Sequence, residues 1–182
     1  MSRFLVVSAV AGEARYVPEG VPVVVTGIGK TAAAVATARA LSGMDITDLV
    51  VLNVGTTGAL HDGLSGLFLP STVINHDVNA EAIRALGIDP RETLSVEGGD
   101  GTVLATGDVF VTDTATRARL AERAQLVDME AYAVVFACQE FGVPVRVVKH
   151  VSDSADEASV DWPAMVDASA RVLGAWVQEQ LA

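Results

Sequence analysis

The sequence predicts an α/β fold in three layers, with helices on both faces of a mixed, mostly parallel central sheet. Short apolar runs rich in β-branched residues, such as Phe4–Val10 and Val145–Val151, are typical of strands that are buried on both faces. Stretches with helical character, such as the alanine-rich Lys30–Leu41, lie between these runs. Alternation of strands and helices along a chain favours a largely parallel sheet covered by helices.

Four apolar runs are predicted to form buried strands. They are Phe4–Val10, Val21–Thr26, Leu49–Asn53 and Val145–Val151. Leu67–Asn75 is predicted as a further strand, and Thr102–Val111 as one or two strands. The stretch Gly87–Gly101 contains Pro90 and several glycines, so we expect a loop there.

Helices are predicted between the strands, and several carry start or stop signals. The helical stretches are Lys30–Leu41, Ala80–Leu86, Thr112–Arg123, Glu130–Phe141 and a last helix that runs to about Leu181. Gly142 and Pro144 follow the fourth helix and provide a stop signal. Asp161 is a candidate N-cap for the last helix.

Length and composition limit the possible classes of protein. The 182 residues predict a single domain over residues 1–182. Hydrophobic residues make up 51% and charged residues 19% of the chain, which excludes a disordered protein. The formal net charge of −11 argues against a nucleic-acid partner, because phosphate contacts need clustered lysine and arginine.

Cysteine usage and hydropathy point to a cytoplasmic protein. Cys138 is the single cysteine, so the chain has no internal disulfide and no multi-cysteine zinc site. Its apolar surroundings predict a buried small residue rather than a nucleophile. No run approaches the ~20 apolar residues that a membrane span needs, and we recognise no signal peptide.

The turn Gly27-Ile28-Gly29-Lys30-Thr31 resembles two phosphate-binding motifs. A P-loop is excluded, because Val24 occupies the position of its first glycine. Gly27, Gly29 and Ala32 fit a relaxed dinucleotide fingerprint, but they follow the second predicted strand instead of the first. We therefore interpret the segment as a tight strand-to-helix turn that needs glycine for close packing.

A second small-residue segment, Asn53–Ala59, follows the strand predicted at Leu49–Asn53. Backbone amides at the carboxyl end of such a strand can line a ligand crevice, or the segment can be a plain turn. Four acidic residues also lie near predicted strand ends or turns, namely Glu13, Asp128, Glu130 and Asp153. If the strands are parallel, these acids can meet at one edge of the sheet and suit general acid–base chemistry.

An ordered set of motifs resembles the purine nucleoside phosphorylase/nucleosidase superfamily. The C-terminal part of the set is Val127-Asp-Met-Glu-Ala131, Phe141-Gly-Val-Pro144 and Val147-Val-Lys-His-Val-Ser-Asp-Ser-Ala-Asp156. Earlier segments match in the same order: Ser8–Glu13, Thr26–Lys30, Asn53–Gly58, His76-Asp-Val78 and Gly107–Val111. The resemblance covers nearly the whole chain and is closest to the methylthioadenosine/S-adenosylhomocysteine nucleosidase branch.

The resemblance implies a role for each matching residue. Asp153 matches the general acid that protonates N7 of the purine, and Glu13 matches the acid that positions and deprotonates water. Glu130 matches the residue that binds the ribosyl hydroxyls, while Met129 matches the residue that packs on the sugar. Phe110 is expected to stack on the purine, and the backbone of Val111 to bind the purine edge. Further pocket residues on this basis are Thr56, Gly58, Asp128 and Ser152.

The implied activity is hydrolysis of the N-glycosidic bond of a purine nucleoside such as 5′-methylthioadenosine or S-adenosylhomocysteine. Asn53 stands where hexameric phosphorylases carry arginine, and phosphate recognition favours arginine, so we prefer water to phosphate as the nucleophile. A phosphate-dependent phosphorylase and a non-catalytic nucleoside-binding module are the alternatives. No cofactor is expected, and the three histidines lack the spacing of metal ligands. The resemblance also implies a homodimer.

Lys149 has two interpretations at this stage. It can serve as an internal anchor or meet an anionic group of the substrate. Arg15 lies close to Glu13 in the sequence and is a candidate contributor to an anion site.

Overall fold

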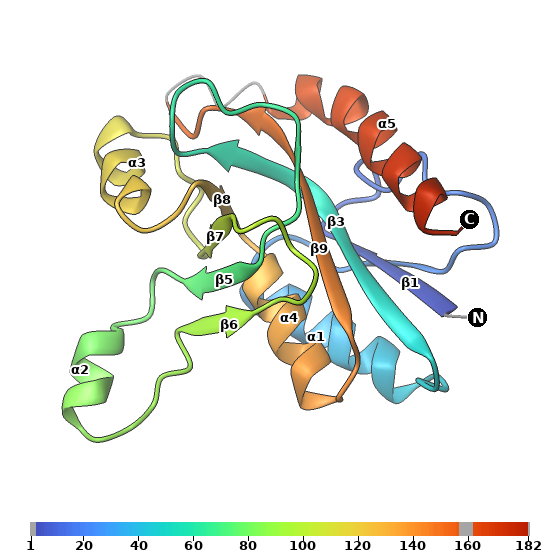
Figure 1. Cartoon of the computed structure of the whole chain (residues 1–182), viewed down its shortest axis with the longest axis horizontal. Coiled ribbons are helices and arrows are strands. Elements are labelled where there is room, and N and C mark those ends of the chain that lie inside the picture. Colours follow the sequence, from blue (N-terminus) through green and yellow to red (C-terminus); the bar gives the residue numbers. More distant parts are fainter. Residues whose placement is uncertain (1–2, 157–161, 182) are drawn as a thin grey trace.

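The computed structural model describes residues 3–156 and 162–181, and in these ranges helices cover both faces of a nine-stranded sheet (Figure 1). The long strand β3 (Leu49–Ala59) lies at its centre. β1 (Arg3–Ser8) pairs with the first half of β3, and β9 (Val145–Asp153) pairs with most of its other edge, both in parallel. The edge strand β2 (Val23–Val25) pairs with β1.

The remaining strands extend the sheet from the carboxyl end of β3. β8 (Leu126–Asp128) pairs antiparallel with Gly58 and Ala59 of β3. β7 (Val103–Thr106), β5 (Thr72–Asn75) and β6 (Thr93–Ser95) follow in that order, and β4 (Leu67–Phe68) pairs with β9. Parallel pairs outnumber antiparallel pairs. The predicted mixed, mostly parallel sheet is therefore confirmed.

Alternating residues of the central strands pack against helices on opposite faces. Leu5 and Val7 of β1 join a core cluster with α1 (Lys30–Ser42) and α4 (Ala131–Glu140). Val6, between them, packs instead with residues of α5 (Trp162–Gln180). Figure 1 shows α5 across the sheet from α1 and α4. This period-two alternation produces the three layers.

Two short helices complete the described fold. α3 (Thr114–Ala121) begins at Asp113, whose side chain accepts a hydrogen bond from the Thr116 amide. α2 (Ala80–Ala85) projects beyond β5 and β6 (Figure 1). In the described ranges, no helix combines the length and the apolarity that a membrane crossing requires.

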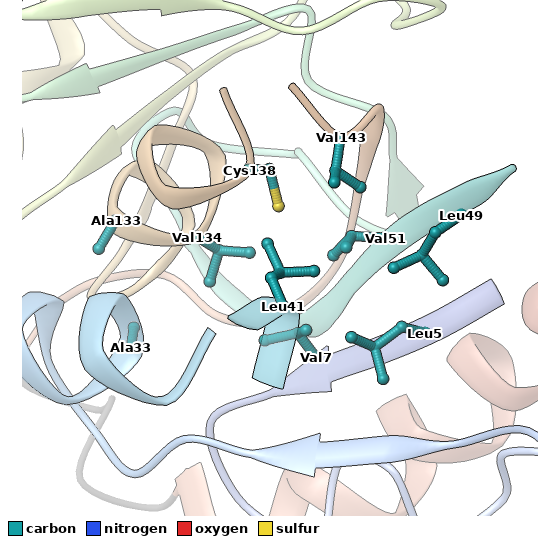
Figure 2. Packing of buried hydrophobic residues seen from close by; sticks show 10 residues of the cluster. All are labelled: Leu5, Val7, Ala33, Leu41, Leu49, Val51, Ala133, Val134, Cys138 and Val143. Atoms are coloured by element: carbon teal, nitrogen blue, oxygen red, sulfur yellow. The ribbon is translucent and has the colours of Figure 1, made fainter. Parts of the chain in front are cut away.

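Cys138 lies inside the α1–α4 cluster (Figure 2). Its thiol points among Leu41, Val134 and Val143, and the residue has no exposed surface. Burial raises the pKa of the thiol to about 12. The prediction of a buried small residue is confirmed.

The strand boundaries differ from the sequence prediction in several places. β1 ends at Ser8 instead of Val10, β2 covers only Val23–Val25, and β9 continues to Asp153. β3 continues to Ala59, because Gly55–Thr57 pair with Lys149–Val151 of β9, whereas the predicted strand ended at Asn53. The strand expected over 67–75 is broken at Pro70, which has no amide to donate to a ladder. β6 lies within the expected loop, and β8 forms just before Met129. One strand, β7, forms within 102–111.

The helix predictions agree to within a few residues. Gly142 follows α4 with φ +66°, the left-handed conformation that ends helices and favours glycine. Gly27 and Gly29 have φ of +84° and +94°, which confirms the interpretation of a tight turn. The predicted N-cap Asp161 lies outside the described residues.

The buried thiol generates a prediction about reactivity. We expect the thiol of native Cys138 to resist 5,5′-dithiobis(2-nitrobenzoate) at pH 8, because only the exposed thiolate reacts. Denaturant should release one reactive thiol per chain, since the sequence has one cysteine. Rapid labelling of the native protein at low reagent concentration would contradict the packing.

Candidate active site

A cavity of about 340 Å³ lies where β3, β8 and β9 meet the turns after β1 and β7. Every catalytic and substrate-binding residue that the family resemblance implies lines this one cavity, whereas Arg15 and Lys149 are not among its lining residues. The lining residues are Ala9, Glu13, Ile28, Thr56, Thr57, Gly58, Val109, Phe110, Val111, Val127, Asp128, Met129, Glu130, Ser152, Asp153 and Ala155. Its volume is within the range of small-ligand sites.

Glu13 lies in the turn after β1, and its carboxylate receives hydrogen bonds on both oxygens. The Thr56 amide and hydroxyl donate to Oε1 at 2.7 and 2.8 Å. The Ser8 hydroxyl and the Val10 amide donate to Oε2 at 3.0 and 3.4 Å. Glu13 is only 3% exposed, so these donors fix the carboxylate at the cavity wall.

Asp153 ends β9 opposite Gly58 of β3. The Ser152 hydroxyl donates to its Oδ2 at 2.6 Å, and the Ala155 amide donates to its Oδ1 at 2.9 Å. A Cβ at Gly58 would lie 3.1 Å from Asp153 Oδ1 and 2.9 Å from the Ala155 Cβ. Gly58 therefore keeps open the space that the Asp153 carboxyl occupies.

Asp128 and Lys149 form a buried ion pair beside the cavity. Lys149 Nζ lies 2.9 Å from Asp128 Oδ2, and both side chains are 2% exposed. Asp128 also accepts from the Thr106 hydroxyl at 2.6 Å and from the Ala131 amide at 3.0 Å. Its oxygens are thus engaged by protein donors, and Lys149 serves as the internal anchor.

Glu130 connects two elements at the cavity. It precedes the first turn of α4, and its Oε1 accepts from the Gly29 amide, at the start of α1, at 2.8 Å. Burial raises the pKa of Glu130 to about 7, and the Asp128 carboxylate adds to this effect while Lys149 opposes it. The backbone amide of Gly29 in the glycine turn therefore donates to the carboxyl group of Glu130.

The rim of the cavity is apolar. Ile28, Val109 and Phe110 are 57%, 57% and 47% exposed. Met129 is partly buried and Val111 is buried. The cavity therefore combines an apolar rim with a carboxyl-rich floor.

The charged side chains that line the cavity are all acidic. Four carboxyl groups line it, and its described lining residues include no lysine or arginine. Arg15 is directed to Asp167, with 3.3 Å between Nη1 and Oδ1 and a side chain that is 67% exposed. Among the described residues, no group of three or more His, Cys, Asp or Glu is arranged to hold a metal ion.

Sequence reasoning missed several contributors. Thr57, Val109 and Ala155 line the cavity beside predicted residues. Ser8 supports Glu13 from the end of β1. The signal available for the first three was their position inside the quoted motifs, and the Ser8 contact depends on the fold of the turn.

Comparison with known proteins gives consistent matches. The model of the phosphorylase superfamily matches residues 99–177. Aminodeoxyfutalosine nucleosidase of Helicobacter pylori is 29% identical over 69% of this chain and 68% of its own length. The 5′-methylthioadenosine/S-adenosylhomocysteine nucleosidase of Shewanella oneidensis is 30% identical over 81% of this chain and 73% of its own.

The extent of these matches varies among relatives. The match to the corresponding nucleosidase of Buchnera aphidicola has 26% identity and spans 63% of that protein's length. The chain thus spans about two thirds of the length of the curated relatives that it matches.

Solved structures share the fold. A mutant of the Helicobacter pylori methylthioadenosine nucleosidase with 5′-methylthioadenosine in its active site has a TM-score of 0.86 at 22% identity, covering 100% of this chain and 98% of that one. The Neisseria meningitidis nucleosidase in complex with methylthio-immucillin-A has a TM-score of 0.80 at 24% identity, covering 96% of each chain.

The raised pKa of Glu130 predicts a pH-dependent contribution to stability. Below pH 4.5 the carboxyl is protonated in both states, and between pH 4.5 and about 7 it ionises only in the unfolded chain. Its contribution to the free energy of unfolding should fall by about 3 kcal/mol across that interval, at ~1.4 kcal/mol per pKa unit. Denaturant titrations of wild type and Glu130→Gln at several pH values measure the difference.

The exposed Glu19 provides a control for the loss of one surface carboxylate, and Glu19→Gln is measured in parallel. A difference between wild type and Glu130→Gln that does not change between pH 4.5 and about 7 would contradict the raised pKa of Glu130.

Proposed function

The chain belongs to the phosphorylase superfamily, and from this membership and the chemistry of the cavity we propose that it is a nucleosidase. It hydrolyses the N-glycosidic bond of a purine nucleoside, with an adenosine derivative such as 5′-methylthioadenosine or S-adenosylhomocysteine as substrate. The observation that carries the proposal is the cavity with four carboxyl groups and, among its described lining residues, no lysine or arginine. Carboxyl groups suit a reaction in which positive charge develops on the sugar.

Asp153 acts on the leaving group. A purine leaves poorly as an anion, so Asp153 donates a proton to N7 while the bond from C1′ to N9 breaks and its electrons pass to the base. The Ser152 hydroxyl and the Ala155 amide orient the Asp153 carboxyl for this transfer.

Glu13 acts on the nucleophile. It accepts a proton from a water molecule as the water oxygen bonds to C1′, so the products are free base and free sugar. The donors on Glu13 favour a fixed carboxylate orientation, which a general base needs to align a water molecule.

Glu130 and the rim hold the nucleoside. Glu130 accepts hydrogen bonds from the ribosyl hydroxyls, and these bonds strengthen as the sugar becomes cationic. Met129 packs on the sugar face, Phe110 stacks on the purine, and the backbone of Val111 binds the purine edge. Thr56 and Gly58 complete the pocket wall, while Asp128 acts indirectly by holding Lys149.

Water fits this site better than phosphate as the nucleophile. A phosphate dianion would enter a cavity that already holds Glu13, Asp128, Glu130 and Asp153. Lys149 already pairs with Asp128, and Arg15 pairs with Asp167, so both side chains are engaged by carboxylates of the chain. The homodimer and the cytoplasmic location stay predictions.

A nucleoside panel tests the proposal. The protein is incubated with 5′-methylthioadenosine, S-adenosylhomocysteine, adenosine and inosine, with and without phosphate, and free base is quantified by chromatography. We expect adenine release without phosphate. Strict dependence on phosphate would replace the hydrolase with a phosphorylase, and tight binding without turnover would indicate a binding module.

Removal of the proposed acid should separate catalysis from folding. We expect Asp153→Asn to lower kcat by ~10²–10⁴-fold, the usual contribution of a general acid. The amide oxygen can still accept from the Ala155 amide, and the Ser152 hydroxyl can rotate to accept from the amide nitrogen, so the melting temperature should change little. Asp62→Asn, at an exposed surface pair with Arg117, should keep wild-type kcat. Wild-type turnover by Asp153→Asn would overturn the assignment.

A further inference from the structure

The segment that carries Glu13 is irregular chain between β1 and β2. Successive turns shape it, with hydrogen bonds from the Glu13 amide to the Val10 carbonyl at 3.2 Å and from the Val17 amide to the Ala14 carbonyl at 3.0 Å. Local turns of this kind open easily. The Glu13 carboxylate nevertheless accepts hydrogen bonds from Thr56 of β3 at 2.7 and 2.8 Å. Contacts outside the turns are therefore needed to hold the segment in this position.

Tyr16 connects this segment to α5, and the segment and α5 lie on the same face of the sheet. Its hydroxyl donates to Asp167 Oδ1 at 2.9 Å. Arg171, one helical turn further along α5, donates from Nε to Asp167 Oδ2 at 3.1 Å. The Arg171 guanidinium also lies 4.4 Å from the centre of the Tyr16 ring, a cation–π distance.

The charge state of Asp167 favours these contacts. The Tyr16 hydroxyl holds the pKa of Asp167 below its ordinary value, and Arg171 and Arg15 act in the same direction. The carboxylate is therefore an acceptor at neutral pH for the hydroxyl and both guanidinium groups.

The main chain of the segment touches the same helix. A Cβ added at Gly174 of α5 would collide with the carbonyl group of Tyr16. A Cβ at Gly12 would lie 3.2 Å from a methyl group of Val166. The segment therefore contacts α5 on both sides of Glu13, at Gly12 and at Tyr16.

We propose that Tyr16 and Asp167 are positioning residues for the hydrolysis, and that they act by holding the segment 12–16 on α5 so that Glu13 stays aligned with the attacking water. The inference rests on the proposed function. Neither residue lines the cavity, so neither is expected to contact the substrate. A displacement of a catalytic group by ~1 Å can cost about 10²-fold in rate, which makes a remote hydrogen bond relevant to kcat.

The sequence offers a matched pair of variants, because it contains two tyrosines and each donates one hydrogen bond. Tyr16→Phe removes the bond to Asp167 and keeps the ring under Arg171. Tyr132→Phe removes a bond of 2.6 Å to the Arg91 carbonyl. Each variant should lower the melting temperature by a few degrees, since one hydrogen bond contributes about 1 kcal/mol.

The kinetic readout distinguishes positioning from general stability. We expect Tyr16→Phe to lower kcat about tenfold with KM within twofold, because it affects the water step and not nucleoside binding. Tyr132→Phe should keep kcat within twofold of wild type. Equal losses of kcat in both variants, or no loss in Tyr16→Phe, would overturn the proposal.

A double variant tests whether the effect passes through Glu13. In a Glu13→Gln background, Tyr16→Phe should cause no further loss of kcat, because the group that it positions is gone. The same tenfold loss in that background would show that Tyr16 acts by another route.

Amide hydrogen exchange separates failure of this inference from failure of the proposed function. Exchange of the Glu13 and Val17 amides should be faster in Tyr16→Phe than in wild type and unchanged in Tyr132→Phe. If wild type hydrolyses no nucleoside, the proposed function fails and the exchange still decides whether Tyr16 holds the segment. If wild type is active and Tyr16→Phe leaves both exchange and kcat unchanged, only the present inference fails.

Discussion

The buried ion pair between Lys149 and Asp128 is the interaction on which the site depends. Burial by itself would lower the pKa of Lys149, yet the pKa is raised, because Asp128, Glu130 and Glu13 all favour the ammonium form. The lysine in turn opposes the rise in the pKa of Glu130. One buried cation therefore lets three carboxyl groups share a small volume, and loss of one partner of such a pair typically costs 3–5 kcal/mol.

The sheet makes this arrangement possible. Lys149 on β9 is in register with Gly55 on β3, and a Cβ at Gly55 would lie 3.0 Å from Lys149 Nζ and 3.3 Å from Glu13 Oε1. The small residue gives the lysine side chain room to cross β3 toward Asp128 on β8. The glycine at position 55 of β3 is therefore needed for the ion pair beside the cavity, in addition to its part in backbone pairing.

The helices on the two faces have different relations to the site. α1 and α4 meet at Glu130, which precedes α4 and accepts from the amide at the start of α1. α5 packs on the other face and contacts the segment that carries Glu13 through Tyr16. Rigid elements on both faces therefore support acids that lie in turns, an arrangement that preorganises a site without placing it on the helices themselves.

The sequence by itself determined the fold class and predicted a set of residues that the structure brings together at one cavity. Apolar runs predicted β1, β3 and β9, Gly142 predicted the end of α4, and the predicted acids all line one cavity. Only the tertiary structure decided that β3 continues through Gly58, that Lys149 pairs with Asp128, and that Tyr16 contacts α5. The physical reason is that local patterns reflect burial and backbone preference, whereas the partner of a charge depends on segments far apart in the chain, such as Tyr16 and Asp167, which folding brings together.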